Sequence, residues 1–330
     1  MPSMNGTIVL EEHFAVAETV DESRQFMPET LWAELRSRLL DIHEKRLPLM
    51  DKYGIETMVL SLNAPAVQGI PDVKRAAEVS RIANDSLAEQ IQKRPGRFAG
   101  LAALPMQDPE AAAAELTRSV KQLRFKGALV NGFSQVKTLD HAVYYDLPQY
   151  WPFWETLEKL DVPFYLHPRN PLHTQQQIYE GHPWLLGPTW AFAVETATHA
   201  LRLMASGLFD KYPRLQIILG HLGEGLPSSI WRADHRIRKF PRGIPASKPL
   251  SEYLRSNFYI TTAGNFRTQT LIGVMMEVGA ERLLFSTDYP FEEISDAADW
   301  FNKASISETD RVNIGRLNAV KLFKLGSTSA

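Results

Sequence analysis

Carboxylate and imidazole side chains recur at the ends of short apolar segments in this sequence. They are Glu11, His13, His167, His221 and Asp288. Carboxylate oxygens and neutral imidazole nitrogens bind divalent ions such as Zn²⁺ and Mn²⁺, and the same groups transfer protons in catalysis. One histidine at the end of a strand is usually a packed or surface residue. Several such ends that meet at one place would instead predict a catalytic metal site.

Eight apolar segments are spaced along the chain, and some of them end in these residues. Stretches with helical patterns lie between the segments. The segments are TIVLEEH (7–13), TMVLSLN (57–63), FAGLAALP (98–105), KGALVNG (126–132), VPFYLHP (162–168), QIILGHLG (216–223), FYITTAG (258–264) and RLLFSTDYP (282–290). Near-continuous apolar runs are typical of parallel strands that are buried on both faces. The pattern therefore predicts an α/β fold, a (β/α)8 TIM barrel with extended loops after its strands. Such barrels have their active sites at the carboxyl ends of the strands, where the candidate ligands would meet.

The first and fourth segments bear on the number of metal ions. Residues i and i+2 of a strand point the same way, so Glu11 and His13 should face the barrel axis together while Glu12 points out. The fourth segment ends in Asn131, and its only lysine, Lys126, stands at the opposite end. A carbamylated lysine that bridges two ions is therefore unavailable. This favours one ion, Zn²⁺ or Mn²⁺, with a coordination position open to substrate.

The segment GHLGEGLP (220–227) places Glu224 three residues after His221. A carboxylate at this spacing could orient and polarise the imidazole, although an acid at a helix N-terminus is common without such a role. Arg232, about two helical turns further on, could bind an acidic substrate group bidentately or could be an ordinary surface arginine. These residues extend the predicted metal site into a candidate catalytic and substrate-binding site.

The composition narrows the class of protein. The 330 residues are 44% hydrophobic, and barrels of this size fold as one unit, so a single domain over 1–330 is expected. The 36 basic and 38 acidic residues nearly cancel, and no basic run is interleaved with aromatics, so a small-molecule substrate is expected rather than nucleic acid. The absence of cysteine excludes disulfides, thiolate nucleophiles and cysteine zinc sites. No signal-peptide or membrane-span pattern is present, so we expect a cytoplasmic protein without membrane contact.

Two connections rich in proline and glycine, 169–190 and 236–250, are longer than the others. Each follows a strand that ends in histidine, either directly or after a short helix. Because loops after strands build the active sites of barrels, these two are expected to form a lid or a subunit contact.

Longer stretches around these residues resemble a known family. The stretches are LEEHFA (10–15), GALVNGF (127–133), DVPFYLHPRNPL (161–172), GHPWLLGPTWAFA (181–193), LGHLGEGLP (219–227), ITTAGNF (260–266) and LFSTDYPFE (284–292). They resemble the metal-dependent decarboxylase branch of the amidohydrolase superfamily, which includes the aminocarboxymuconate-semialdehyde decarboxylases. Within that branch they are most similar to the γ-resorcylate (2,6-dihydroxybenzoate) decarboxylases. The resemblance spans nearly the whole chain.

This resemblance implies a carboxy-lyase of aromatic compound catabolism that converts 2,6-dihydroxybenzoate reversibly to resorcinol and CO₂. The metal ligands that it implies are Glu11, His13, His167 and Asp288. The catalytic residues that it implies are His221 and Glu224, with Asp288 as the candidate proton donor. Asn131 and Arg232 are the implied substrate contacts. A TIM barrel and a homotetramer are further family expectations.

Three other interpretations remain open. Decarboxylases of 2,3-dihydroxybenzoate and salicylate share the scaffold, but some of them have alanine in place of the histidine of the first motif, so Glu-Glu-His favours the γ-resorcylate type. The same ligands could activate water against a lactone or an amide, although only a decarboxylase would release CO₂ from a hydroxybenzoate. A noncatalytic barrel that binds an aromatic acid would be expected to lose metal ligands, and every expected ligand type is present.

Overall fold

Eight short apolar segments pair as parallel strands of a barrel in the computed structural model, which describes residues 4–326. The strands are β1 (Thr7–Phe14), β2 (Ile55–Leu62), β3 (Phe98–Gly100), β4 (Ala128–Asn131), β7 (Phe164–His167), β8 (Ile217–Leu219), β9 (Phe258–Thr261) and β10 (Leu283–Leu284). Each overlaps one of the predicted segments, so the predicted fold class is confirmed. The strands at 98–105 and 282–290 are shorter than predicted, because the chain leaves the ladder before the last residues of those segments.

The strands follow one another around the barrel in chain order. One ladder joins β1, β2 and β3, and a second joins β4, β7, β8, β9 and β10. An isolated bridge between Ala102 and Ala128 connects the two ladders. The ring closes where the backbone N–H of His13 donates to the carbonyl of Tyr289 at 2.7 Å. The first and last strands are therefore held together next to the predicted site.

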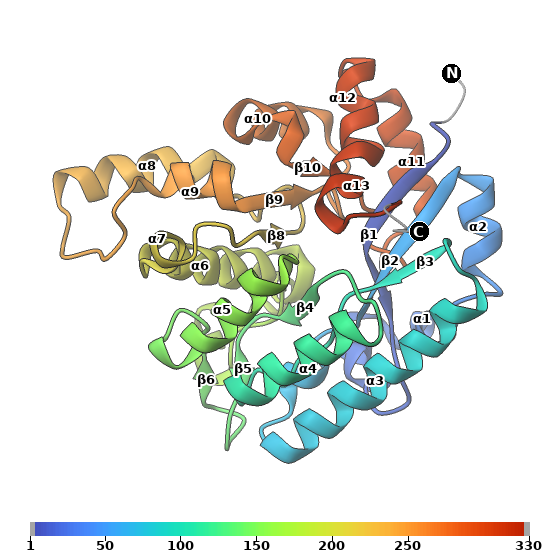
Figure 1. The fold of residues 1–330 in the computed structure, drawn as a ribbon, viewed down its shortest axis with the longest axis horizontal. Helices are drawn as coiled ribbons and strands as arrows, with labels where there is room; N and C mark the ends of the chain where they lie inside the picture. The colour runs from blue at the N-terminus through green and yellow to red at the C-terminus, as the bar shows by residue number, and fades with distance from the viewer. Residues whose placement is uncertain (1–3, 327–330) are drawn as a thin grey trace.

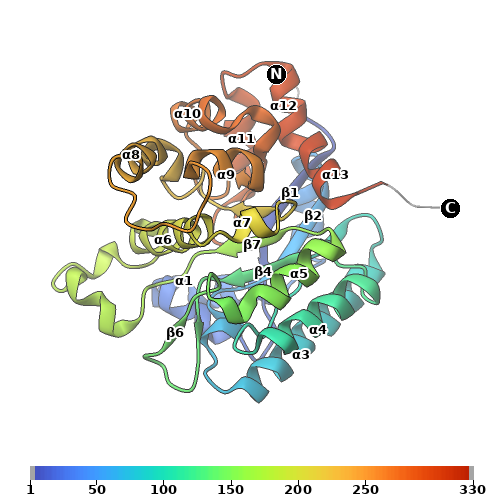
Figure 2. The same cartoon turned by 60° about the vertical axis from the view of Figure 1, so that its left-hand side comes forward.

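Helices cover the outside of the barrel (Figures 1 and 2). The longer ones are α1 (Glu29–Leu40), α3 (Val73–Lys93), α4 (Pro109–Lys121), α5 (Trp151–Leu160), α6 (Ala191–Ala205), α8 (Leu226–Lys239), α10 (Thr268–Val278) and α11 (Ile294–Lys303). The shorter ones are α2 (Arg46–Lys52), α7 (Leu208–Lys211), α9 (Leu250–Asn257), α12 (Glu308–Val312) and α13 (Asn318–Phe323). Short helical turns are η1 (Val20–Phe26), η2 (Ala66–Gly69), η3 (Pro148–Tyr150), η4 (His173–Tyr179), η5 (Pro183–Leu185), η6 (Gly187–Thr189), η7 (Ala280–Arg282) and η8 (Asn313–Leu317), and a hairpin adds β5 (Ser134–Gln135) and β6 (Ala142–Val143). Within residues 4–326, no helix has both the length and the apolar character to cross a membrane.

The interior of the barrel is a separate apolar cluster, formed by alternate residues of the strands. Its members on the strands, together with Leu101 directly after β3, are Ile8, Leu10, Val59, Ala99, Leu101, Leu129, Tyr165, Ile218, Tyr259 and Leu284. Helix α13 adds Leu322 and Phe323 to this cluster. The side chain of Asn318 donates to the carbonyls of Ala280 and Leu283, where β10 begins. Helix α13 therefore closes the end of the barrel opposite the predicted site.

A β-bulge in β1 decides which side chains face the site. Ile8 and Leu10 point into the barrel, so strict alternation would turn Glu12 inward and His13 outward. The register instead jumps from Leu10↔Val59 to Glu12↔Leu60, which leaves Glu11 as an extra residue with a φ of 65°. Alternation counted from Ile8 and Leu10 therefore fails at Glu11, because one added residue shifts the phase by one. The orientation predicted for Glu11, His13 and Glu12 is nevertheless the one observed. As a result Glu11 and His13 both reach the site, while Glu12 points away from it.

The two long connections project from the body of the molecule. The segment between β7 and α6, yellow-green in Figure 2, contains η4, η5 and η6. The predicted connection at 236–250 begins too early, because residues 236–239 form the last turn of α8. The helix ends at Lys239, since Phe240 precedes Pro241 and a residue before proline is disfavoured in helical conformation. The rest of this connection projects as a loop in Figure 1.

Candidate metal centre and active site

The carboxyl ends of four strands bring the predicted metal ligands and His221 together. The ligand atoms of Glu11, His13 and His167 all lie within 4.8 Å of one another, and so do those of Glu11, His221 and Asp288. Glu11 belongs to both groups, so the two groups border one position. Asp288 lies four residues beyond β10 rather than within a strand. Its place is therefore set by the loop after β10.

Distances within the cluster are too long for good hydrogen bonds but suit a shared ion. His13 Nε2 lies 3.4 Å from Asp288 Oδ1, and His167 Nε2 lies 3.6 Å from Glu11 Oε1. Ligands about 2.0–2.2 Å from one ion are separated by such distances. Glu11 Oε1 and both ring nitrogens of His13 are buried without a hydrogen-bond partner among the described residues. Because orphaned buried polar atoms are rare, these atoms fit the binding of a divalent ion.

The electrostatics of the cluster also fit a cation. Burial raises the pKa of the Glu11 carboxyl to about 8, so its charged form needs a positive partner. Burial, together with the positive charges of His13 and His221, holds the pKa of His167 well below its ordinary value. His167 is therefore a neutral imidazole, which is the form that binds metal ions.

His221 and Glu224 form the pair that their spacing predicts. His221 Nδ1 lies 2.7 Å from Glu224 Oε1. Burial lowers the pKa of His221, but the carboxylates of Glu224 and Glu11 outweigh burial and hold that pKa well above its ordinary value. Burial raises the pKa of Asp288, but hydrogen bonds and charge from His13 and His221 outweigh it and bring that pKa below its ordinary value. These opposite shifts favour a proton on His221, whose Nε2 is 3.5 Å from Asp288 Oδ2.

The backbone at the site is strained. Glu11, His221, Glu224 and Asp288 have φ angles of 65°, 52°, 54° and 64°. This left-handed region is uncommon for residues other than glycine, and each instance costs about 1–3 kcal/mol. Such conformations persist only where the surrounding structure holds them, and they cluster at active sites. Their concentration here marks the site independently of its side-chain chemistry.

Three residues that sequence reasoning missed orient Glu11. The hydroxyls of Tyr165 and Thr261 both donate to Glu11 Oε2, the latter at 2.9 Å. This leaves Oε1 for a metal ion. Gly220 lets the carboxylate lie close, because a Cβ at this position would be 2.7 Å from Glu11 Oε1. Tyr165 stands two residues before His167 in the same strand, so strand alternation could have identified it.

A small, mostly apolar cavity of about 100 Å³ opens onto this cluster. It is lined by Phe26, Met27, Ala64, His167, Pro188, Phe192, His221, Asp288, Phe291 and Glu292. Its volume is of the same order as the cavity of about 150 Å³ that accepts one benzene ring. The aromatic rings come from η1, α6 and the loop after β10, which are distant in sequence. Simple sequence patterns could not have grouped them.

The two predicted substrate contacts lie outside the lining of this cavity. Asn131 pairs with His167 across the β4–β7 ladder, but its side-chain N–H donates to the carbonyl of Asn63 at 3.0 Å. Its Oδ1 is buried and has no partner among the described residues. Arg232 is exposed on α8 and does not reach the cavity within one chain. The structure therefore brings Asn131 near the cluster but leaves Arg232 apart from it.

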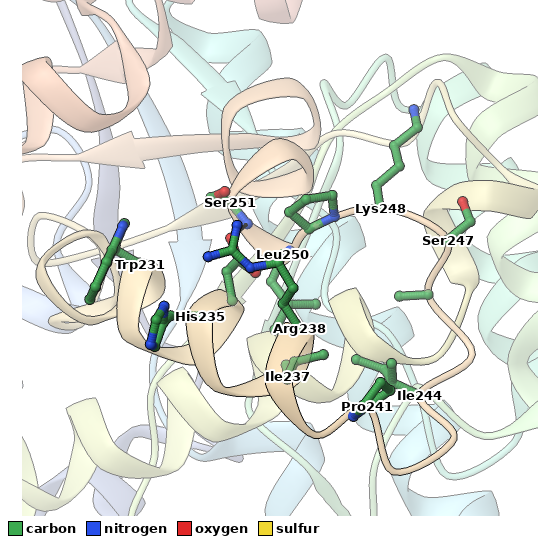
Figure 3. Close-up of a pocket in the computed structure, with 13 residues that line it drawn as sticks. Trp231, His235, Ile237, Arg238, Pro241, Ile244, Ser247, Lys248, Leu250 and Ser251 are labelled. Carbon is green, nitrogen blue, oxygen red and sulfur yellow. Dashed lines mark hydrogen bonds between the residues drawn. The ribbon is translucent and has the colours of Figure 1, made fainter.

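A separate groove of about 460 Å³ lies between α8, the loop after it and the start of α9 (Figure 3). The rings of Trp231 and His235 stack beside it, with centroids 5.0 Å apart. Arg238 and Lys248 also line it, and none of its lining residues belongs to the metal cluster. The chemistry predicted from the sequence therefore belongs to the cavity and not to this groove.

A barrel of this kind, with a histidine and carboxylate cluster at the carboxyl ends of its strands, defines a metal-dependent enzyme of the amidohydrolase type. The amidohydrolase family model matches residues 20–325. The chain belongs to this family and, within it, to the group of γ-resorcylate decarboxylases.

Known proteins of that group are similar over almost their whole length. The γ-resorcylate decarboxylase of Polaromonas sp. strain JS666 is 65% identical over 98% of this chain and 99% of its own. That of Rhizobium sp. strain MTP-10005 is 64% identical over the same shares of the two chains. A crystal structure of a 2,6-dihydroxybenzoate decarboxylase with 2,6-dihydroxybenzoate has a TM-score of 0.96 and 64% identity, over 98% of this chain and 100% of that one. A Polaromonas dihydroxybenzoic acid decarboxylase with manganese and 2-nitroresorcinol also has a TM-score of 0.96 and 64% identity, over 98% of both chains.

Proposed function

We propose that this protein is a metal-dependent nonoxidative decarboxylase that converts 2,6-dihydroxybenzoate to resorcinol and CO₂. The observation that carries the proposal is the apolar cavity, which ends at both a cluster suited to a divalent ion and a histidine–aspartate pair. An aromatic acid could lie with its ring between the phenylalanines and its polar groups at the cluster. The relatives that are named for this reaction support the choice of substrate.

The difficulty of the reaction lies in the bond between the ring and the carboxylate. Direct loss of CO₂ would leave a carbanion in the plane of the ring, which the π-system cannot stabilise. Protonation of C1 avoids this species. A new C1–H bond then forms, the bond to the carboxylate breaks, and its electron pair restores the aromatic ring as CO₂ leaves. One proton is consumed for each CO₂ released.

Asp288 and His221 are the residues that we assign to this proton transfer. The two oxygens of Asp288 face different partners, since Oδ1 is beside His13 and Oδ2 is beside His221. Glu224 stabilises the charged form of His221 through their hydrogen bond. A proton on His221 can therefore pass to Asp288 and from there to C1. This arrangement supports Asp288 as the donor once an anionic substrate has entered.

We assign Glu11, His13, His167 and Asp288 as the ligands of one ion, Mn²⁺ or Zn²⁺. When bound, such an ion supplies Lewis-acid chemistry that favours the ionised form of an ortho hydroxyl group. The apolar walls of the cavity exclude water from the ring and strengthen the electrostatic interactions at its end.

The test is an assay of purified protein with 2,6-dihydroxybenzoate, 2,3-dihydroxybenzoate and 2-hydroxybenzoate, alongside metal analysis. We expect about one divalent ion per chain and CO₂ release fastest from 2,6-dihydroxybenzoate. Chelation should abolish the release, and added Mn²⁺ or Zn²⁺ should restore it. Protein that holds no metal and releases no CO₂ from any of the three acids would refute the proposal. Hydrolysis of a lactone or an amide by such protein would favour the hydrolase instead.

Replacing Glu224 by glutamine should lower kcat for 2,6-dihydroxybenzoate by about 10–100-fold, as is typical for the loss of a carboxylate that supports an active-site histidine. Glutamine keeps the shape and a hydrogen bond to His221 Nδ1 but removes the charge that stabilises the imidazolium. Metal content should be unchanged, because Glu224 is outside both ligand groups. Glu155→Gln, on the surface of α5 and paired with Lys159, is the matched control. A kcat equal to that of the control would remove Glu224 from the mechanism.

We further propose that each chain forms one barrel domain over 1–330 and that four chains assemble into a homotetramer. Four large apolar side chains support the assembly, because they are more than half exposed on the 169–190 segment and on α8. They are Ile178, Trp184, Trp190 and Trp231. Exposed apolar patches of this kind mark protein interfaces. Arg232, next to Trp231, would then contact substrate only across a subunit boundary.

A further inference from the structure

The Glu12 side chain makes contacts that the proposed reaction does not use. It is fully buried and points away from the cavity. Its Oε1 accepts a hydrogen bond from the backbone N–H of Thr287 at 2.8 Å. Its Oε2 accepts from Thr287 Oγ1 at 2.6 Å and from the backbone N–H of Tyr289 at 3.2 Å. A single carboxylate therefore holds the chain directly before and directly after Asp288.

The loop that carries Asp288 needs such support. Asp288 lies beyond the end of β10 and has a φ of 64°, a conformation that costs free energy for any residue other than glycine. Because Asp288 lies outside β10, the hydrogen bonds of the β-ladder do not hold its backbone in place. The N–H groups of Thr287 and Tyr289 would otherwise be buried donors without a partner, which is costly. The hydrogen bonds to Glu12 thus stabilise a strained ligand position.

Arg46 completes the support from the other side. Its buried guanidinium donates to the carbonyl of His13 and, at 2.8 Å, to the carbonyl of Asp41. It also lies 4.9 Å from the centre of the Tyr289 ring. The guanidinium of Arg46 thus lies against the ring of the residue that follows Asp288 while it binds the backbone of His13. The ends of β1 and β10 are thereby linked through charged groups as well as through the backbone.

We infer that Glu12 is a positioning residue, which fixes Asp288 relative to His13 and so sets the affinity of the site for its metal ion. This inference rests on the proposed function, since it takes both residues as ligands of one ion. The second glutamate of the Glu-Glu-His motif then has a role different from that of the first. Glu11 binds the ion, while Glu12 holds the loop that carries Asp288, the ligand that is furthest from Glu12 in the sequence.

The test measures metal affinity rather than activity alone. Glu12→Gln should raise the Mn²⁺ dissociation constant of the metal-free protein by about 10–100-fold, measured by competition with a chelator. The glutamine NH₂ would face one of the donors that Glu12 now accepts from, so the loop would lose at least one hydrogen bond. Asn257→Ala is the control for general destabilisation, because Asn257 also binds buried carbonyls, those of Pro213 and Leu215, but at the opposite end of the strands. The melting temperature of each variant is recorded beside its affinity.

A second pair of variants keeps the test decisive if Glu12→Gln does not fold. Thr287→Val removes only the hydroxyl that donates to Glu12 and should weaken Mn²⁺ binding, whereas Thr287→Ser keeps a hydroxyl and should restore it. The inference is overturned if Glu12→Gln, or Thr287→Val in its place, binds Mn²⁺ no more weakly than Asn257→Ala. Failure of the unmodified protein to bind Mn²⁺ or Zn²⁺ would instead refute the proposed function, so the two failures are distinguishable.

Discussion

Replacing Asp288 by asparagine should lower kcat for 2,6-dihydroxybenzoate by about 10²–10⁴-fold, the usual contribution of a positioned general acid. The amide cannot donate a proton to C1 and return to its starting state. The same variant should fail to exchange the ring hydrogens of resorcinol in D₂O, because exchange is the protonation step run without CO₂. Release of CO₂ and loss of the ring signals in the proton NMR spectrum measure the two effects.

Metal analysis separates this effect from simple loss of the ion. Three ligands remain in Asp288→Asn, so part of the metal should be retained. Asp299→Asn, an exposed position on α11, is the matched control and should behave as the unmodified protein. Ring exchange at the full rate in Asp288→Asn would remove Asp288 from the donor role, even if decarboxylation were slow.

Gly220→Ala should weaken Mn²⁺ binding by about 10–100-fold and reduce activity at limiting metal to the same extent. The added methyl group would lie 2.7 Å from Glu11 Oε1, closer than real contacts allow. The carboxylate cannot move aside cheaply, because Tyr165 and Thr261 hold its other oxygen. The unpartnered oxygen that suits an ion would therefore be displaced. Chelator competition on the metal-free variant measures the change.

Gly273→Ala is the control for this substitution. Gly273 lies within α10, and a methyl group there would meet nothing within 4 Å. Alanine should therefore leave metal binding unchanged and stabilise the helix by about 1 kcal/mol. Equal metal affinities in Gly220→Ala and Gly273→Ala would show that the Glu11 carboxylate has more freedom than its hydrogen bonds indicate.

Much of the barrel could be predicted because its signals are local. Apolar runs identified all eight strands. Asp108 followed by Pro109 is a local signal of the same kind, because the Asp108 side chain caps α4 and proline suits the first position of a helix. The candidate ligands could be grouped because parallel strands end at one mouth. Their roles as ligands and catalysts stay predictions until the variants are measured.

The bulge at Glu11 could not be predicted from alternation. Counting from Ile8 and Leu10 turns Glu12 inward, and only an extra residue in the ladder reverses this. Such a residue is stabilised by contacts with another strand, including those that Glu12 makes with the loop after β10. These contacts join residues more than 270 positions apart, as the separation of 275 between Glu12 and Thr287 illustrates. No window of sequence contains them.

The aromatic residues that line the cavity could not be predicted from the sequence for a similar reason. Phe26 and Phe192 meet with ring centroids 5.3 Å apart, although one comes from η1 and the other from α6. Neither stands at the end of a strand. The exposed position of Arg232 is likewise a matter of how α8 packs, which the spacing from Glu224 does not reveal.

Helix α13 has a consequence for how the protein is made. The barrel interior includes Leu322 and Phe323, and Asp288 lies in the loop after the last strand. Glu11 and His13 are therefore synthesised long before the residues that complete the barrel core and the metal cluster. The barrel interior cannot be completed before β10 and α13 have been made, so the earlier apolar strands wait for these later elements. The ligand cluster that includes Asp288 is likewise complete only after the loop beyond β10 has been made.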